Sequence, residues 1–242
     1  MTLDQQHIVV FGGSSGLGLA VGQAALAAGA KVTLIARNAE RLHAAAQRLA
    51  APPHRLRTLQ ADITDAAAVV QAIQAGAPPD HVYVAAGAFV GGSVLTESVE
   101  HFRSALDARL WGAVHAVRAA APLMRGPASS FVFTGAISTD RPAKGAWATA
   151  VATAASEQLA RALAVELAPL RFNAMAPGWT DTPMWDSLLG DAKANTFATV
   201  GAQIPVGHLA SADDVAQAVL LLMANRSLNG EVLHVDGGHR LV

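Results

Sequence analysis

Short apolar runs alternate along the chain with longer segments in which apolar residues recur at helical spacing. Runs of four to six residues rich in Val, Ile, Leu and Phe are typical of strands that are buried on both faces of a parallel sheet. Seven such runs occur, at His7–Phe11, Lys31–Ala36, Leu56–Gln60, Val82–Ala85, Phe131–Thr134, Arg171–Ala176 and Val232–Val235.

The helical segments between these runs complete a strand–helix alternation. They lie near residues 16–28, 38–49, 65–75, 96–121, 145–168 and 212–224. This order predicts an α/β fold, a doubly wound parallel sheet of about seven strands with helices on both faces. No repeat, low-complexity linker or break in composition divides the chain, so we expect one domain over residues 1–242. In such folds, ligands bind beyond the carboxyl ends of the strands, where the strand order reverses.

Residues 177–210 interrupt the alternation. This segment holds seven Gly or Pro residues together with the aromatic residues Trp179, Trp185 and Phe197. A connection of this length inside a compact domain is usually functional. Because it follows the carboxyl end of a strand, we expect a substrate lid at about 178–210. The alternative is an insertion whose aromatic side chains pack only on their own scaffold.

Composition and charge narrow the possible functions. The chain has no cysteine, which excludes disulfides, thiolate catalysis and cysteine-bound metals, and is compatible with the cytoplasm, where we expect the protein. The nine histidines show no metal-ligand spacing, so no metal is expected. Net charge is −1 without a long basic run, so nucleic acid is not an expected partner. No stretch of about 20 apolar residues occurs, so a membrane span is not expected either.

The proportion of charged residues also bears on assembly. Charged residues make up 14% of the chain and hydrophobic residues 52%, which leaves little charge to cover the surface of a monomer. We therefore expect a homo-oligomer that buries helix faces between subunits. The alternative is a large alanine-rich core in a single copy.

The segment Phe11–Gly18, Phe-Gly-Gly-Ser-Ser-Gly-Leu-Gly, lies between the first apolar run and the first helical segment. Its glycines allow the backbone to approach a pyrophosphate at the N-terminus of a helix, and its serines can add hydroxyl contacts. The sequence of strand, glycine loop and helix therefore predicts a Rossmann-type dinucleotide site. Contacts to the dinucleotide are expected from Gly12, Ser14, Ser15, Gly16, Leu17 and Gly18.

The end of the second apolar run indicates which dinucleotide is bound. A carboxylate at this position would bind a ribose 2′-hydroxyl and repel a 2′-phosphate. This chain has Ala36, Arg37 and Asn38 there, and the planar guanidinium of Arg37 suits a phosphate. We therefore expect NADP(H) as cofactor in preference to NAD(H). The alternative for Arg37 is a solvated arginine at the start of a helix.

Several motifs, in one order along the chain, resemble those of the short-chain dehydrogenase/reductase family. The glycine loop resembles the family's Thr-Gly-x-x-x-Gly-x-Gly with Phe11 in place of threonine, and Val84–Gly87 resembles its Asn-Asn-Ala-Gly. Asn173–Gly178 resembles the family's run into a Pro-Gly pair, and Val235–Gly238 resembles its C-terminal strand ending. The resemblance spans essentially the whole chain. It implies cofactor contacts from Asp62, Ile63, Ala86, Gly87, Pro177, Gly178 and Thr182, and a homo-oligomer, tetramer or dimer, built by the helices near 96–121 and 145–168.

The resemblance also implies where catalysis would occur. In the family, a tyrosine passes a proton to or from the substrate oxygen while a hydride moves at the nicotinamide. A lysine four residues later lowers the pKa of that tyrosine. These two positions fall on Trp147 and Val151, the family's serine position falls on Thr134, and its asparagine position falls on Arg109. An indole is too weak an acid to deliver a proton, and valine carries no polar group, so only Thr134 keeps the required hydroxyl.

Other side chains could replace the missing acid. Lys144, Ser138 and Asp140 lie on the segment that leaves the fifth apolar run, and Lys144 could equally be a solvated loop lysine. Arg109 could polarise a carbonyl or bind an acidic substrate, although it cannot give up its proton. The only tyrosine, Tyr83, is expected in the core.

Three functions remain open. The first is an NADP(H)-dependent oxidoreductase with an atypical active site, acting on a small substrate such as an activated alkene, imine or quinone. The second is a catalytically inactive NADP(H)-binding sensor, regulator or assembly subunit. The third is a structural subunit that binds no nucleotide. In the first case, an apolar or aromatic substrate would suit a pocket of Phe89, Trp147, Trp179 and Trp185.

Overall fold

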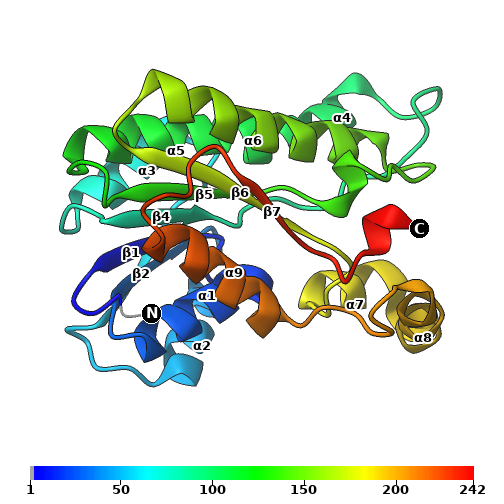
Figure 1. Ribbon diagram of the computed structural model, residues 1–242, viewed down its shortest axis with the longest axis horizontal. Helices are drawn as coiled ribbons and strands as arrows, with labels where there is room; N and C mark the ends of the chain where they lie inside the picture. The colour runs from blue at the N-terminus through cyan, green and yellow to red at the C-terminus, as the bar shows by residue number, and fades with distance from the viewer. Residues whose placement is uncertain (1–2) are drawn as a thin grey trace.

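The computed structural model describes residues 3–242 and contains one seven-stranded sheet in the order β3-β2-β1-β4-β5-β6-β7 (Figure 1). Every neighbouring pair of strands is parallel. The strand order reverses between β1 and β4, which confirms the doubly wound topology predicted from the sequence. The strands are β1 (His7–Phe11), β2 (Lys31–Ala36), β3 (Leu56–Gln60), β4 (His81–Val84), β5 (Ser130–Thr134), β6 (Arg171–Pro177) and β7 (Val232–Val235).

Successive strand residues point to opposite faces of the sheet, and each face has its own apolar core. Val9 and Phe11 belong to one core, whereas Ile8 and Val10 belong to the other. Figure 1 shows the helices in two layers with the sheet between them. One layer contains α1 (Gly16–Ala27), α2 (Ala39–Leu49) and α9 (Ala212–Ala224), and the other contains α3 (Ala66–Gln74), α4 (Val99–Leu106), α5 (Gly112–Ala120) and α6 (Trp147–Glu166).

The helical segment expected over 96–121 is helical without a break over residues 99–123, but its hydrogen-bonding pattern changes along its length. It consists of α4, a π-helical turn over Asp107–Trp111, α5 and a short 3-10 turn over Ala121–Leu123. A π-helical turn adds a residue to the helical repeat, so it changes which side chains face the sheet. Arg109 lies in the middle of this turn.

The predicted lid contains helices that the sequence pattern did not indicate. These are α7 (Pro183–Leu189), a 3-10 turn over Gly190–Ala192, and α8 (Lys193–Gln203). Thr180 and Ala210 form an isolated parallel bridge at the base of the segment. In Figure 1, α7 and α8 project beyond the two helical layers.

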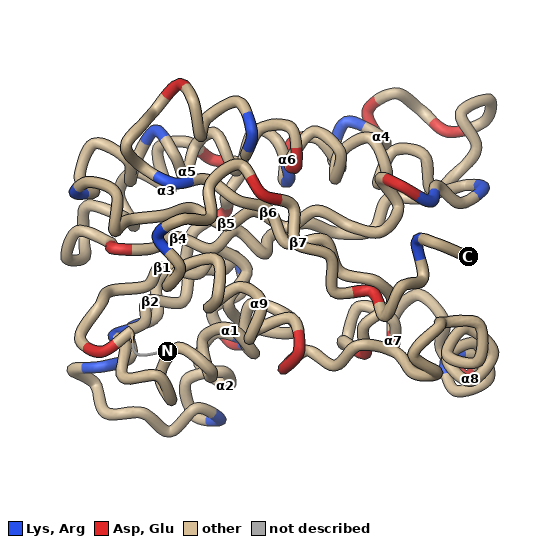
Figure 2. Tube along the Cα trace, in the orientation of Figure 1, with Lys and Arg blue, Asp and Glu red and all other residues tan. Residues whose placement is uncertain are grey.

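The charged residues do not form a basic stripe. Figure 2 shows Lys and Arg interspersed with Asp and Glu along the trace. Within residues 3–242, no helix has the length and the apolar character that crossing a bilayer requires.

Candidate active site

The glycine loop is packed so tightly that side chains would not fit at two of its positions. Gly12 has a φ of +80°, and a Cβ added there would lie 2.8 Å from the backbone nitrogen of Ala86. A Cβ at Gly18 would collide with the carbonyl oxygen of Gly12. The loop therefore joins β1, α1 and the end of β4 with only backbone between them, which leaves a cradle for a phosphate at the helix N-terminus.

The open end of α1 faces the base of the lid. Ser15 caps α1 without a side-chain hydrogen bond to the helix, so its hydroxyl is free for a ligand. Thr182 is 9% exposed, and a Cβ added at Gly16 would lie 3.5 Å from its Cβ. The structure thus brings Thr182 to the glycine loop, although Thr182 lies 166 positions after Gly16 in the sequence. Leu17 packs against the core, and Ser14 is half-buried.

Pro177 and Gly178 complete this end of β6. Pro177 is the last residue of the strand and is buried. A Cβ at Gly178 would lie 2.8 Å from the Cα of Asp236, so this position accepts only glycine without rearrangement. The tight packing fixes the point at which the lid leaves the sheet.

The end of β2 presents a guanidinium rather than a carboxylate. The Arg37 side chain is 76% exposed, and its Nη1 lies 3.8 Å from Asp62 Oδ2 on the segment after β3. Asn38 instead caps α2, because its Oδ1 accepts a hydrogen bond of 2.8 Å from the Arg41 backbone nitrogen. Ile63 is buried against Gly112. An exposed, loosely paired arginine here can reach a phosphate.

Arg109 carries two buried nitrogen atoms that lack hydrogen-bond partners in the described part of the chain. Its guanidinium packs on Gly87, where a Cβ would lie 2.9 Å from Arg109 Cζ. Nε and Nη1 of Arg109 are buried and have no hydrogen-bond partner among residues 3–242. Burial lowers the pKa of this guanidinium. Buried donors without acceptors are rare in folded proteins, so this arrangement is typical of a site that binds a ligand.

The Thr134 hydroxyl is already engaged by the sheet. Thr134 is the last residue of β5, is 7% exposed, and donates a hydrogen bond of 2.8 Å to the Val84 carbonyl oxygen. Its Oγ1 also lies 3.1 Å from the hydroxyl of Tyr83. Tyr83 is fully buried, as expected, and burial raises its pKa to about 12. Neither hydroxyl is presented at an open surface.

Helix α6 exposes Trp147 and Val151 and buries the threonines near them. Trp147 is 37% exposed and packs on Phe102 with ring centroids 4.5 Å apart, and Val151 is 51% exposed. The inward residues are Thr149, which exchanges hydrogen bonds with the backbone of Val90, and Thr153, which is fully buried. Exposure of Trp147 and Val151 does not test the mapping of the tyrosine and lysine positions, which stays a prediction. The inward positions also lack these residue types, since α6 contains neither tyrosine nor lysine.

Glu157 is a candidate functional residue that the sequence reasoning missed. It is 3% exposed, and its Oε1 accepts hydrogen bonds from the Ala136 nitrogen at 3.2 Å and the Thr139 hydroxyl at 2.9 Å. Burial raises the pKa of its carboxyl. The available signal was the spacing of polar residues within an alanine-rich helix, in which Glu157 follows Thr153 and Thr149 at intervals of four.

The lid aromatics pack mainly on one another. Trp179 and Trp185 are stacked with centroids 4.2 Å apart, and Phe197 meets both edge-on. Lys193 holds the same segment together through Asp181 at 2.7 Å and Asp186 at 2.6 Å. Phe89, from the segment after β4, lies against Gly91. Among the four residues of the predicted pocket, Trp179 and Trp185 contact each other, Trp147 contacts Phe102, and Phe89 lies beside Gly91; the pocket itself stays a prediction.

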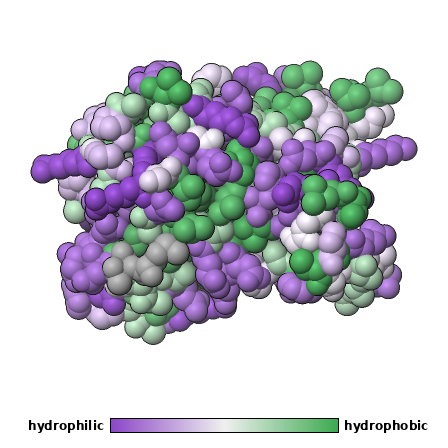
Figure 3. All heavy atoms as spheres, viewed as in Figure 1, coloured by the Kyte–Doolittle hydropathy of each residue, from purple (hydrophilic) through white to green (hydrophobic). Residues whose placement is uncertain are grey.

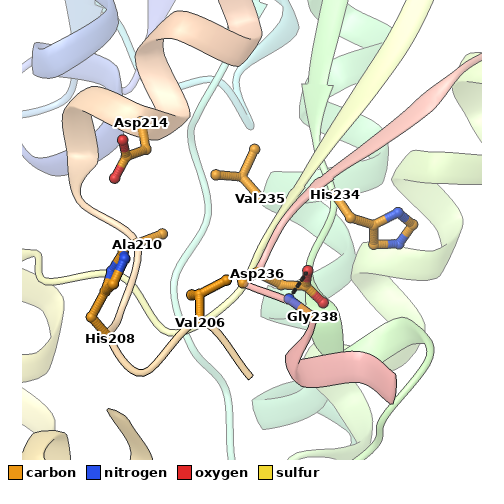
Figure 4. Close-up of a pocket in the computed structure, with 9 residues that line it drawn as sticks. Val206, His208, Ala210, Asp214, His234, Val235, Asp236 and Gly238 are labelled. Carbon is orange, nitrogen blue, oxygen red and sulfur yellow. Dashed lines mark hydrogen bonds between the residues drawn. The ribbon is translucent and has the colours of Figure 1, made fainter. Parts of the chain in front are cut away.

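A pocket of about 360 Å³ lies elsewhere, between the base of the lid and the end of β7 (Figure 4). His208 from the base of the lid and Asp214 from the first turn of α9 border it on one side, and His234 and Asp236 border it on the strand side. None of the residues predicted to bind cofactor or substrate lines this pocket. Residues 3–242 contain no group of three or more His, Cys, Asp or Glu placed to hold a metal ion.

The comparisons with known proteins agree with this fold. A family model described as enoyl-(acyl carrier protein) reductase matches residues 12–240. The short-chain dehydrogenase/reductase ATR9 of Stachybotrys chlorohalonatus is 31% identical over 256 residues, covering 98% of each chain. The NADPH-bound short-chain oxidoreductase of Pseudomonas aeruginosa PAO1, described as containing an atypical catalytic center, is 29% identical with a TM-score of 0.89 over 97% of each chain. The MalC reductase/Diels-Alderase of Malbranchea aurantiaca has a TM-score of 0.93 at 24% identity, covering 99% of this chain and 98% of that one, a likeness of fold. The chain belongs to the short-chain dehydrogenase/reductase family.

Proposed function

We propose that this protein is an NADP(H)-dependent oxidoreductase that acts on a small apolar or aromatic substrate and uses Arg109 as the polar group of its reacting centre. The observation that carries this proposal is the buried guanidinium whose Nε and Nη1 lack acceptors beside Gly87. That position lies at the carboxyl end of β4, next to the point where the strand order reverses. Ligands of doubly wound sheets bind at this place.

The residues present fit a dinucleotide. Gly12, Gly16 and Gly18 keep the cradle free of side chains, and the N-terminus of α1 offers backbone N–H groups to a pyrophosphate. Thr182 would contact the nicotinamide end, since it lies against the glycine loop. Arg37 favours a 2′-phosphate, because no carboxylate follows β2 directly. The NADPH-bound relative from Pseudomonas aeruginosa supports the same cofactor.

Arg109 would bind and polarise the substrate. The cofactor, when bound, supplies or accepts the hydride. The two free N–H groups of Arg109 can donate to a carbonyl oxygen, an imine-derived anion or a carboxylate, and would stabilise negative charge that develops there. A guanidinium stays protonated, so substrates that need little acid assistance fit best, such as activated alkenes, imines or quinones. Thr134 would hold the end of β4 in place through the Val84 carbonyl.

The surface supports a homo-oligomer, either a dimer or a tetramer, which belongs to the same proposal. Trp111, Val151 and Val165 are 53%, 51% and 82% exposed on and beside α5 and α6. Figure 3 shows hydrophobic residues in the centre of the face where Figure 1 draws the edge strand β7 and α9. Exposed apolar side chains on such elements are typical of subunit contacts. A cytoplasmic location is proposed with it.

The test pairs direct cofactor binding with turnover. We expect NADPH to bind the wild type more tightly than NADH in fluorescence titrations, and to be oxidised with a member of a quinone, enone and imine panel. Arg109→Met should lower turnover by about 100-fold, the usual effect of losing one preorganised donor to the reacting group. Arg118→Met, at an exposed arginine of α5, serves as the matched control. Tight NADPH binding without turnover would instead support the inactive sensor or assembly subunit.

A further inference from the structure

A stripe of polar residues runs along the buried face of α6. Thr149, Thr153, Ser156 and Glu157 are 7%, 0%, 2% and 3% exposed in an otherwise alanine-rich helix. Their spacing of four, three and one residues places them on one helical face. An alanine-rich helix could pack on the sheet without them, so their contacts require an explanation.

The stripe joins three segments at the carboxyl ends of β4 and β5. Thr149 holds the backbone of Val90 in the segment after β4. The Ser156 hydroxyl lies 3.3 Å from the Arg109 carbonyl oxygen in the π-helical turn. Thr153 and Glu157 contact Ser138, Thr139 and Ala136 in the segment after β5. The stripe therefore borders the same end of the sheet as Arg109.

Glu157 is buried without a cation. No Lys, Arg or His among residues 3–242 lies within salt-bridge distance of its carboxyl. The segment after β5 is shaped around this carboxyl, since a Cβ at Gly135 would collide with Glu157 Oε1. The charged groups that influence it are Asp140, which disfavours ionisation, and His234, which is paired with Asp140 at 2.8 Å and favours it. Burial therefore raises the pKa of this carboxyl and disfavours its ionised form.

A chain of hydroxyls connects this carboxyl with the segment that leaves β5. Glu157 Oε1 lies 2.9 Å from Thr139 Oγ1, and Thr139 Oγ1 lies 3.3 Å from Thr153 Oγ1. Thr153 Oγ1 lies 3.3 Å from Ser138 Oγ, and Ser138 is half-buried. Each hydroxyl can donate and accept, so the direction of the chain can reverse. Separations of 3.3 Å are long for hydroxyl pairs, and catalytic contacts commonly shorten when substrate binds.

We propose that Glu157 holds the proton for the reaction and delivers it to the substrate through Thr139, Thr153 and Ser138. This inference rests on the proposed function. Reduction adds one hydride, from the dihydronicotinamide, and one proton, from the Ser138 hydroxyl, to the substrate. Ser138 regains a proton from Thr153, Thr153 from Thr139, and Thr139 from the Glu157 carboxyl. Glu157 is left as a carboxylate, which takes a proton from water after the product has left. Arg109 binds and polarises the substrate, and the hydroxyl chain provides the proton that Arg109 cannot release.

The decisive variant is Glu157→Gln, whose amide oxygen can still accept from Thr139 and from the Ala136 nitrogen. We expect NADPH affinity and KM to change less than about twofold and kcat to fall by about 100-fold, the range of a lost general acid. In the wild type, kcat should fall at high pH, where Glu157 loses its proton. The residual activity of Glu157→Gln should not show this fall. Glu166→Gln, an exposed carboxylate at the end of the same helix, should behave as wild type. Thr153→Val keeps the Glu157 carboxyl but interrupts the chain of hydroxyls, so its kcat should also fall.

A readout without substrate tests the proton directly. Infrared spectra of the wild type at pH 7 should contain a protonated-carboxyl band that is missing from Glu157→Gln and retained in Glu166→Gln. Absence of this band, or turnover within twofold of wild type in either Glu157→Gln or Thr153→Val, would overturn the relay alone. A wild type that binds NADPH but turns over no substrate would overturn the proposed function and the relay together.

Discussion

Replacing Arg109 with methionine should make the protein more stable while it removes activity. Arg109 buries Nε and Nη1 with no acceptor among the described residues. Each buried donor left without a partner costs about 1–3 kcal/mol, so two of them cost roughly 2–6 kcal/mol. Methionine is unbranched and would retain most of the contact with Gly87, while it removes both donors. We take the lower end, about 2 kcal/mol of added stability, because part of the residue remains accessible to water.

Urea and thermal unfolding without nucleotide measure this gain. For a chain of 242 residues, about 2 kcal/mol corresponds to a rise of about 4–8 °C in the melting temperature. Arg118→Met, at an exposed arginine, should change stability by less than about 0.5 kcal/mol. A loss of more than about 1 kcal/mol in Arg109→Met, with Arg118→Met unchanged, would mean that the guanidinium stabilises the fold. The reasoning from its unpaired donors would then be refuted.

Three further outcomes follow from the structure. Arg37→Ala should weaken NADPH binding by about tenfold, since one charged contact to the 2′-phosphate is lost, and should leave NADH binding unchanged. Paired titrations measure both affinities, and equal losses for the two nucleotides would contradict this prediction. Gly12→Ala should abolish nucleotide binding measured by calorimetry, because its Cβ would lie 2.8 Å from Ala86 N; normal affinity would mean that the loop relaxes freely. Burial lowers the pKa of His81 from 6.5 to about 3. The neutral imidazole therefore makes its full contribution to folding stability above pH 6.5, and this contribution decreases as pH falls towards 3. At pH 4.5 the free energy of unfolding, measured with urea, should be lower by about 3 kcal/mol than above pH 6.5. This loss should disappear in His81→Gln and remain in His54→Gln, which replaces an exposed histidine.

The strands were predictable because their side chains face two apolar cores. Val82 and Val84 pack on one face and Tyr83 on the other, so an apolar run with no polar alternation marks each strand to within about one residue. The glycine loop was predictable for a similar reason, since its geometry depends on residues adjacent in the sequence. The lid helices were not predictable, because their stability comes from contacts such as the stacking of Trp179 on Trp185.

The active site was harder to predict because helix phase decides it. Helix α6 is rich in alanine on every side, so its hydrophobic pattern does not reveal which face is inward. Family spacing places the tyrosine and lysine positions on Trp147 and Val151, and the hydrogen bonds of Thr149 and the burial of Thr153 define the face of α6 that packs inward. The polar side chains identify that face more reliably than the apolar ones, because buried polar groups need partners and alanines do not.

Arg109 and Glu157 are buried ionisable residues at the same end of the sheet. One is a cation without acceptors, and the other is a carboxyl without a cation, yet they do not form an ion pair with each other in the described structure. Packing alone would be served better by an apolar residue at either position. A buried cation and a buried carboxyl that are not paired with each other are what a site requires if one group must bind negative charge and the other must keep a proton. A direct contact would pair the two groups, since the nearby guanidinium would lower the pKa of the carboxyl and favour loss of its proton to solvent, so their separation is itself an argument for two distinct roles.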